Sequence, residues 1–369
     1  MNRLCFADLN RQFMRCQDDV EEAIARVLQS QRFIGGPELE AFEKRFTTLL
    51  GASHAIGVSS GTDALIASLM ALDIGPGDEV ITPPFGFFAS AEAIVRVGAR
   101  PVFVDIDPDD FLLDNTLVES AITERTRAIL VVHLFGQMAD MTGLMAIARR
   151  HDLEVIEDAA QAVLAKRDGH TAATVGTTGC FSFFPAKNLG AFGDGGMVVT
   201  QHDRIAAELR KIRRHGTQDG KTFERIGGNF RLDAIQAAVL GAKLGYLPQW
   251  TEERRVNAGR YDEALADLDA IRLPVRRGKD AHVYHQYVIR THDRDPLKAH
   301  LAEVGVESRI YYPYAMHEHP ALAHLGHRPD AFPESYCAAR EVLALPIFSE
   351  LQEDEQQRVI EGIRSFYRM

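Results

Sequence analysis

The chain has 369 residues, of which 46% are hydrophobic and 25% charged, and its formal net charge at pH 7 is -11. This composition is typical of a globular protein with a large and a smaller domain, and it excludes fibrous and disordered chains. The negative charge argues against nucleic acid as a partner, because nucleic-acid binders carry a basic face that neutralises phosphates.

The cysteines and the apolar segments indicate the compartment. Cys5, Cys16, Cys180 and Cys337 include no Cys-x-x-Cys pair, which argues against a disulfide framework or a zinc knuckle. The longest apolar run, at residues 128–135, is far shorter than the roughly 20 residues of a membrane span. The first eight residues lack the charged and apolar regions of a secretion signal. We therefore expect a protein of the reducing cytoplasm that has no membrane partner.

Short β-branched runs alternate with amphipathic segments over residues 54–200. This alternation predicts an α/β fold in which a mostly parallel seven-stranded sheet is sandwiched by helices. Leu65, Leu69 and Leu72 share one helical face, and Asp140 is a candidate N-cap for the helix that follows it. The expected strands lie at residues 54–58, 79–82, 101–105, 127–133, 153–157, 180–184 and 197–200.

The remainder of the chain predicts a smaller α+β domain. A long helical pattern covers residues 231–247, and a polar stretch follows it at 249–255. We place the domain boundary near residue 248, which gives a large domain, 1–248, and a small C-terminal domain, 249–369. In the small domain we expect a helix at 256–268, strands at 283–289 and 308–312, and a closing helix at 353–366.

Three motifs fall where strands end, which is where open α/β sheets bind their ligands. Lys187 stands between aromatic residues and glycines, a setting that suits a desolvated, nucleophilic lysine, although a solvated loop lysine has the same pattern. Asp158 closes an apolar strand, where its carboxylate can hold a protonated pyridine nitrogen or cap the next helix. Residues 59–62, Ser-Ser-Gly-Thr, open a helix and favour either a bound phosphate or an ordinary N-cap.

An amine, a carboxylate and a phosphate site at strand ends of one sheet match the three attachments that pyridoxal phosphate needs. On these motifs the chain resembles the nucleotide-sugar aminotransferases, a DegT-type family of fold-type I pyridoxal phosphate enzymes. The resemblance covers essentially the whole chain. It rests on residues 8–9, 35–43, 59–65, 77–81, 155–161, 181–196, 215–216 and 227–231.

The resemblance implies a role for each motif residue. Lys187 would bind the cofactor as a Schiff base and would be catalytic together with Asp158, which would pair with the pyridine nitrogen. Gln161 would lie beside the hydroxyl group of the ring. The phosphate would be held by Gly61, Thr62 and Ser182.

Phe87 and Asn229 complete the cofactor site that the resemblance implies, and Arg231 is a candidate substrate contact. Phe87 stands where the family has an aromatic residue stacked on the cofactor ring, although its pattern alone also fits a core phenylalanine. Gly86 replaces the threonine of many relatives, so this chain lacks one hydroxyl near the cofactor. Asn229 and Arg231 resemble residues that reach the phosphate and substrate of a neighbouring subunit, although locally they also fit a turn and a helix start. The resemblance therefore implies a homodimer with active sites at the subunit interface.

The C-terminal part carries the candidate substrate contacts. Tyr312 and His317 resemble residues of the family's loop that closes over the sugar and the diphosphate. His319, His324 and His327 lie nearby, but no acidic or cysteine residue has ligand spacing with them, so we expect no metal.

The sequence predicts transfer of an amino group from an amino acid, with L-glutamate as the expected donor, to the C3 keto group of a sugar carried by a nucleotide diphosphate. The block around Lys187 is most similar to relatives that aminate C3, whereas C4-specific relatives more often have a histidine shortly before the lysine. The alternatives are a 4-keto sugar aminotransferase, a pyridoxamine phosphate-dependent sugar dehydratase and a non-catalytic sensor. The presence of Lys187 disfavours the dehydratase, and that of Lys187 and Asp158 disfavours the sensor.

Overall fold

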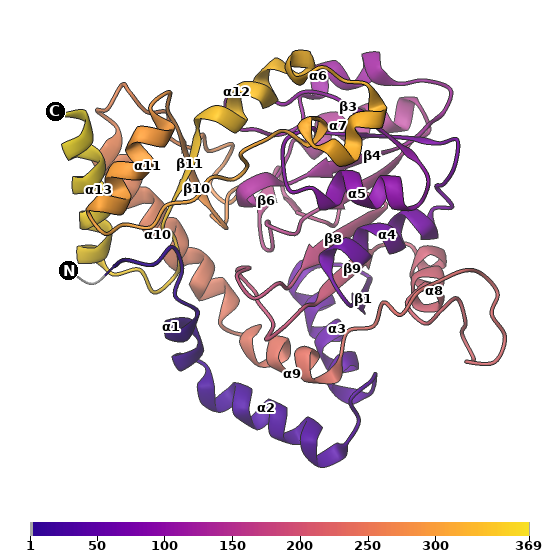
Figure 1. Ribbon diagram of the computed structural model, residues 1–369. Helices are drawn as coiled ribbons and strands as arrows, with labels where there is room; N and C mark the ends of the chain where they lie inside the picture. The colour runs from indigo at the N-terminus through magenta and orange to yellow at the C-terminus, as the bar shows by residue number, and fades with distance from the viewer. Residues whose placement is uncertain (1–2, 369) are drawn as a thin grey trace.

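A computed structural model describes residues 3–368, and a seven-stranded sheet lies at its centre (Figure 1). Its strands are β1 (His54–Val58), β2 (Glu79–Thr82), β3 (Arg100–Phe103), β4 (Thr126–Val132), β5 (Glu154–Asp158), β8 (Thr178–Ser182) and β9 (Gly196–Thr200). Their order is β1-β9-β8-β5-β4-β2-β3, and all neighbours are parallel except the two pairs that β9 forms. The predicted mostly parallel sheet is therefore confirmed, and each strand begins and ends within two residues of its expected bounds.

Helices cover both faces of the sheet. Those discussed here are α2 (Gln17–Ser30), α3 (Pro37–Leu50), α4 (Gly61–Ala71), α5 (Ala89–Arg96), α8 (Asp203–Ile212) and α9 (Ala234–Lys243). Cys180 of β8 contacts Ser68 of α4, whereas the next residue, Phe181, packs edge-on against Phe46 of α3. Because successive side chains of a strand point to opposite faces, α3 and α4 lie on opposite sides. Helix α4 packs beside α5 and α8, and α9 packs against α2 and α3.

The side chains of the last two residues of β5 point to opposite faces of the sheet. Asp158 lies beside Cys180 in the register of the sheet, so its side chain points to the face that carries α4 and α5. Glu157 points to the other face and is fully buried. Its carboxylate accepts hydrogen bonds from Nε2 of His133 and from the backbone N–H groups of residues 173, 175 and 176. Glu157 therefore fixes the fold, and Asp158 is available to a ligand.

The remaining elements of the large sheet region are short. Helix α7 (Met141–Arg150) begins as predicted, because Asp140 Oδ1 accepts the N–H of Gly143 at 3.0 Å. None of the helices within residues 3–368 is both long and apolar enough to cross a membrane. The other elements here are α1 (Leu9–Met14), α6 (Asn115–Val118), β6 (Lys166–Arg167) and β7 (His170–Thr171).

The predicted long helix at residues 231–247 is wrong, because the chain turns within it. Helix α9 ends at Lys243, and α10 (Leu247–Leu265) begins after a short turn. The polar stretch at 249–255 lies within α10, so the helix expected at 256–268 begins earlier and ends at Leu265. One of its polar residues, Arg254, is buried and donates to two backbone carbonyls.

Two hydrophobic cores share α10. Leu247 belongs to the core around the sheet, and Tyr261 belongs to a second core in the C-terminal part. Leu4, near the start of the chain, also joins this second core. We propose two domains, 1–248 and 249–369, with Leu4 of the large domain packed on the smaller one.

The C-terminal part is an α+β unit. Strand β10 (Tyr287–Arg290) pairs antiparallel with β11 (Val342–Leu345), so the strand expected at 283–289 is shorter and begins later. The strand expected at 308–312 is wrong, because that segment forms only one bridge, from Arg309 to β11. The helices are α11 (Arg294–Glu303), α12 (Pro333–Glu341) and the predicted closing helix α13 (Glu353–Tyr367).

Candidate active site

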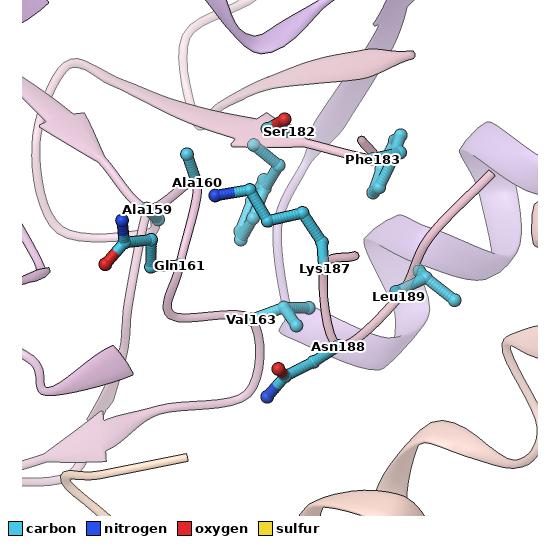
Figure 2. A pocket seen from close by; sticks show the side chains of 10 residues that line it. Ala159, Ala160, Gln161, Val163, Ser182, Phe183, Lys187, Asn188 and Leu189 are labelled. Atoms are coloured by element: carbon cyan, nitrogen blue, oxygen red, sulfur yellow. The ribbon is translucent and has the colours of Figure 1, made fainter. Parts of the chain in front are cut away.

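Lys187 lies in the loop after β8, and its side chain is half-buried. Figure 2 shows this side chain extending across a pocket toward Ala160 and Gln161, with Ser182 also lining the pocket. Within the described residues its Nζ has no hydrogen bond or ion pair. Burial lowers the pKa of Lys187 to about 8, against the opposing effect of the Asp158 charge. A free amine with this pKa can act as a nucleophile near neutral pH.

Asp158 ends β5 and is 7% exposed. Ser90, in the first turn of α5, donates its hydroxyl to Oδ2 at 2.8 Å, and the backbone N–H of Ala160 donates to Oδ1 at 3.1 Å. These two donors hold the carboxylate in one orientation. Because its charge acts on Lys187, the two groups that the sequence analysis paired face one site.

The start of α4 and the end of β8 form an anion cradle. A side chain at Gly61 would place its Cβ 2.7 Å from Cβ of Ser182, so only glycine permits this approach. Ser60 caps the helix by accepting the N–H of Asp63 at 3.0 Å. Among the described residues, the N–H groups of Gly61 and Thr62 have no partner, as is usual in a first helical turn. These N–H groups are free to donate to an anion bound at this N-terminus, where the helix dipole is positive.

Phe87, Tyr312 and Gln161 form a connected group beside the pocket. Phe87 is 59% exposed and so is not a core phenylalanine. Its ring centroid lies 6.2 Å from that of Tyr312, whose hydroxyl accepts a hydrogen bond from Gln161 Nε2 at 3.0 Å. Gln161 Oε1 accepts the N–H of Phe135 at 2.6 Å, which fixes the amide. Burial raises the pKa of Tyr312, so its hydroxyl stays neutral.

The glycine before Phe87 is required by the backbone. Gly86 has a φ of +154°, which residues with a side chain rarely adopt, and an added Cβ would lie 3.3 Å from Cε of Met316. The N–H of Met316 donates to the carbonyl of Pro84 at 2.6 Å, which holds the C-terminal segment against this turn. The missing hydroxyl at position 86 is therefore explained by local geometry.

Three predicted residues are not brought to this pocket by the single chain. Within residues 3–368, Asn229 is exposed, Arg231 is half-buried with Nε lacking a hydrogen-bond partner, and neither lines the pocket. Arg231 precedes α9 and does not begin it. His317 is 4% exposed; its Nε2–H donates to the carbonyl of Pro329 at 2.9 Å, and its ring packs on Phe332. The roles of these three residues stay predictions.

Ser90, which contacts Asp158, and His285, which contacts Asn188, were not predicted from the sequence. Ser90 lies only three residues after Phe87, and this closeness was its one available signal. His285 gave no local signal, because it comes from the C-terminal part of the chain. Its Nδ1 lies 3.4 Å from Oδ1 of Asn188, and burial, followed by the charge of Lys187, lowers the pKa of His285. In the described part of the chain, no three His, Cys, Asp or Glu side chains form a group that could hold a metal ion.

This set of groups fits pyridoxal phosphate. The cofactor needs an anion site, an amine for its aldehyde, an acid for its pyridine nitrogen and a surface for its ring, and the chain offers them at Gly61, Lys187, Asp158 and Phe87. The anion site would be lost if Gly61 carried a side chain. Together with the sheet of parallel strands interrupted by one antiparallel strand, these groups define a fold-type I pyridoxal phosphate-dependent aminotransferase.

Sequence comparison gives the family. The chain belongs to the DegT/DnrJ/EryC1/StrS aminotransferase family, whose sequence pattern matches residues 15–364. It is therefore an aminotransferase, and its cofactor is pyridoxal phosphate, as the sequence analysis predicted.

Named relatives align along nearly their whole length. The pleiotropic regulatory protein of Geobacillus stearothermophilus is 46% identical, over 98% of both chains. The UDP-N-acetyl-3-dehydro-alpha-D-glucosamine 3-aminotransferase of Acidithiobacillus ferrooxidans is 44% identical, over 97% of this chain and 96% of its own. The dTDP-3-amino-3,4,6-trideoxy-alpha-D-glucose transaminase of Streptomyces venezuelae is 43% identical, over 99% of this chain and 96% of its own.

Solved structures have the same fold. The structure of Streptomyces venezuelae DesV in complex with a ketimine intermediate gives a TM-score of 0.98 at 42% identity, with 100% of both chains covered. That of NtdA from Bacillus subtilis with bound PMP gives a TM-score of 0.93 at 32% identity, with 100% of this chain and 86% of that chain covered. The predicted fold class is therefore confirmed.

The lowered pKa of Lys187 predicts how cofactor attachment depends on pH. Only the neutral amine attacks an aldehyde, so the rate at which the apoprotein captures pyridoxal phosphate should rise with pH up to about 8 and then level off. An amine with the ordinary pKa of 10.5 would show a rate that keeps rising well above this value. Stopped-flow absorbance of the captured cofactor across this range measures the profile. A rate still climbing above about pH 9 would contradict the lowered pKa.

Proposed function

We propose that this enzyme transfers an amino group from an amino acid, L-glutamate, to the C3 keto group of a sugar attached to a nucleotide diphosphate. The observation that carries the proposal is the free, half-buried amine of Lys187, which shares one site with the fixed carboxylate of Asp158. Bound pyridoxal phosphate supplies an electron sink and carries the nitrogen between the two substrates.

Each site residue has a distinct task in this proposal. When the cofactor is bound, the Lys187 amine would take a proton from the substrate carbon as a base and return it as an acid on the cofactor side. Asp158 holds the positive charge of the pyridine nitrogen. The ring is positioned by Phe87 on its face and Gln161 at its hydroxyl. The phosphate is bound by Gly61, Thr62 and Ser182.

The choice of C3 is supported by the relatives together with the sequence block around Lys187. The relative from Acidithiobacillus ferrooxidans is named as a 3-aminotransferase of a UDP sugar, and the one from Streptomyces venezuelae as a transaminase of a dTDP-3-amino sugar. Both names place the amine at C3 and differ in the nucleotide. The position of the amine on the sugar is therefore better supported than the identity of the nucleotide base.

A homodimer completes the proposed site. Asn229 is exposed, and Arg231 has an unpartnered Nε, which suits residues that act on the phosphate and substrate of a neighbouring subunit. The nearby side chains of Phe223 and Ile226 are 64% and 83% exposed, which suits a contact between subunits. A molecular mass in light scattering equal to that of one chain would contradict the dimer.

The alternatives differ in what they require. A sugar dehydratase of this fold has no use for the Lys187 amine, whose pKa is lowered here. A regulatory role is suggested by the names of two relatives, the pleiotropic regulatory protein of Geobacillus stearothermophilus and the erythromycin biosynthesis sensory transduction protein EryC1 of Saccharopolyspora erythraea. A non-catalytic sensor would not need both the nucleophilic amine and the oriented carboxylate, so catalysis is the better proposal.

A substrate panel tests the function. The purified enzyme with pyridoxal phosphate should lose its visible absorbance when L-glutamate is added, and regain it when a 3-keto UDP or dTDP sugar is added. We expect kcat/KM for the 3-keto sugar to exceed that for the 4-keto sugar by roughly two orders of magnitude, because a misplaced carbonyl leaves polar groups of the site unpaired. Mass spectrometry of the amino sugar identifies the position.

Each failure has its own meaning. Preference for the 4-keto sugars would transfer the assignment to C4. Absorbance that responds to glutamate but to no nucleotide sugar would reject the sugar nucleotide as acceptor. An absorbance change with another amino acid, and none with glutamate, would replace the donor.

A further inference from the structure

Lys243, the last residue of α9, is a buried cation behind the loop that carries Lys187. It is 3% exposed, and within residues 3–368 no carboxylate lies at ion-pair distance from it. Its Nζ donates to the carbonyl of Gly190 at 2.5 Å. The rings of Phe192 and Trp250 lie 5.5 Å and 5.9 Å from the same nitrogen. The carbonyl is therefore its one hydrogen-bond partner in the described structure.

Such a lysine is costly to the fold. Burial lowers the pKa of Lys243 to about 8, and a buried ammonium group without a carboxylate partner is unfavourable. The end of a helix, a carbonyl and two aromatic faces offset part of that cost. An apolar side chain of similar length would fill the same space at no such cost, so packing alone does not account for a cation here.

The loop that Lys243 holds is folded back on itself. The N–H of Lys187 donates to the carbonyl of Phe184 at 2.8 Å, and the N–H of Ala191 donates to that of Phe183 at 2.8 Å. A Cβ on Gly190 would lie 2.2 Å from the carbonyl oxygen of Pro185, so these two stretches of backbone are in direct contact. A displacement of Gly190 is thus passed to the residues that immediately precede Lys187.

A second anchor, Gln236, lies on the same helix about two turns before Lys243. Gln236 accepts the N–H of Phe192 at 2.8 Å and donates to its carbonyl at 3.3 Å. This pair fixes the exit of the loop. Within residues 3–368, only Lys243 donates a side-chain hydrogen bond to the carbonyl of Gly190, the residue that lies against Pro185, two residues before Lys187.

We propose that Lys243 is a positioning residue for the catalytic lysine: its hydrogen bond to the carbonyl of Gly190 holds the loop in the conformation that directs the Lys187 amine into the pocket. The inference rests on the role proposed for Lys187. It assigns Lys243 no contact with substrate or cofactor.

The test compares variants that remove or keep the donor. Lys243→Met and Lys243→Gln both lose a donor long enough to reach Gly190, whereas Lys243→Arg keeps one. Arg45→Met is the matched control, because Arg45 also forms a hydrogen bond that involves α9, donating to the backbone carbonyl of Gly241 in that helix at 2.7 Å. Amide hydrogen exchange of the peptide 183–192 is measured in the apoprotein, and kcat and KM are measured in the holoenzyme.

We expect faster exchange of the Lys187 and Ala191 amides in the Met and Gln variants, with exchange elsewhere in the sheet unchanged. In the holoenzyme kcat should fall by roughly tenfold to a hundredfold with KM within about twofold, because a small misplacement of a reacting group slows the chemical step. Lys243→Arg should recover part of both effects. Arg45→Met should behave like the wild type.

Wild-type exchange and kcat in either folded neutral variant would overturn the proposal, as would a lowered melting temperature with no change in the 183–192 peptide. If Lys243→Met does not fold, Lys243→Gln decides. A Lys187→Ala variant separates this failure from that of the proposed function: if it keeps full activity, the role of Lys187 is wrong, whatever Lys243 does.

Discussion

Replacing Lys187 with alanine should abolish the covalent binding of pyridoxal phosphate and reduce turnover by about a thousandfold or more. The variant loses both the amine that attacks the cofactor and the group that moves the proton, and each of these contributes a large factor. Visible absorbance after gel filtration measures retained cofactor. Single-turnover reaction with glutamate measures the rate.

The control for this substitution is Lys166→Ala. Lys166 begins β6 and is exposed, so its loss should leave both measurements unchanged. Borohydride reduction followed by peptide mass spectrometry should place the cofactor on Lys187 in the wild type. Labelling of any other lysine would reject the assignment.

Replacing Asp158 should slow the reaction while leaving the cofactor attached. Without the carboxylate the positive charge of the ring nitrogen is not stabilised, and we expect a loss of roughly 10²–10³-fold in the single-turnover rate. Both Asp158→Ala and Asp158→Asn should show it. The alanine variant should also be less stable, by about 1–3 kcal/mol, because the Ser90 hydroxyl and the Ala160 N–H lose their acceptor.

The asparagine variant separates charge from hydrogen bonding, since its amide oxygen can still accept one of these two bonds. Thermal melting compares stability, and Glu154→Gln, at the other end of β5, is the matched control for loss of an acid from this strand. Wild-type rates in Asp158→Asn would remove the carboxylate charge from the mechanism.

Much of the large domain was predictable because its physical signals are local. Buried parallel strands are short, continuous apolar runs, so their positions were found to within two residues. The groups proposed to bind the cofactor follow these strands directly, so the sequence also pointed to Lys187, Asp158 and the 59–62 turn. Their meeting in space follows from the rule that parallel strands end at one edge of a sheet.

The errors arose where tertiary contacts override local pattern. The 249–255 stretch is polar yet lies in α10, because Arg254 is buried and satisfied by backbone carbonyls. The 308–312 segment is rich in strand-forming residues, but only Arg309 finds a partner in β11. The environment of His317 also depends on distant residues, and its ring is enclosed by aromatic side chains that no spacing rule connects to it.

Phe87 and Ser90 illustrate the same limit within the site. The sequence could not decide whether Phe87 is in the core, because exposure depends on what the C-terminal segment covers. The contact between the Ser90 hydroxyl and Asp158 could not be predicted, because it depends on how α5 packs against the end of β5. Both questions were settled by packing between segments far apart in the chain.

Helix α10 acts as a rigid rod common to both halves of the molecule. Its 19 residues span about 28 Å, and a bend in its middle would break its internal hydrogen bonds. A rocking motion of the C-terminal half would therefore pivot at the turn between α9 and α10, immediately beside Lys243. Such a motion would displace Lys243 and, through its hydrogen bond to Gly190, the loop that carries Lys187. The conformation of the whole subunit would then affect the direction in which the Lys187 amine points.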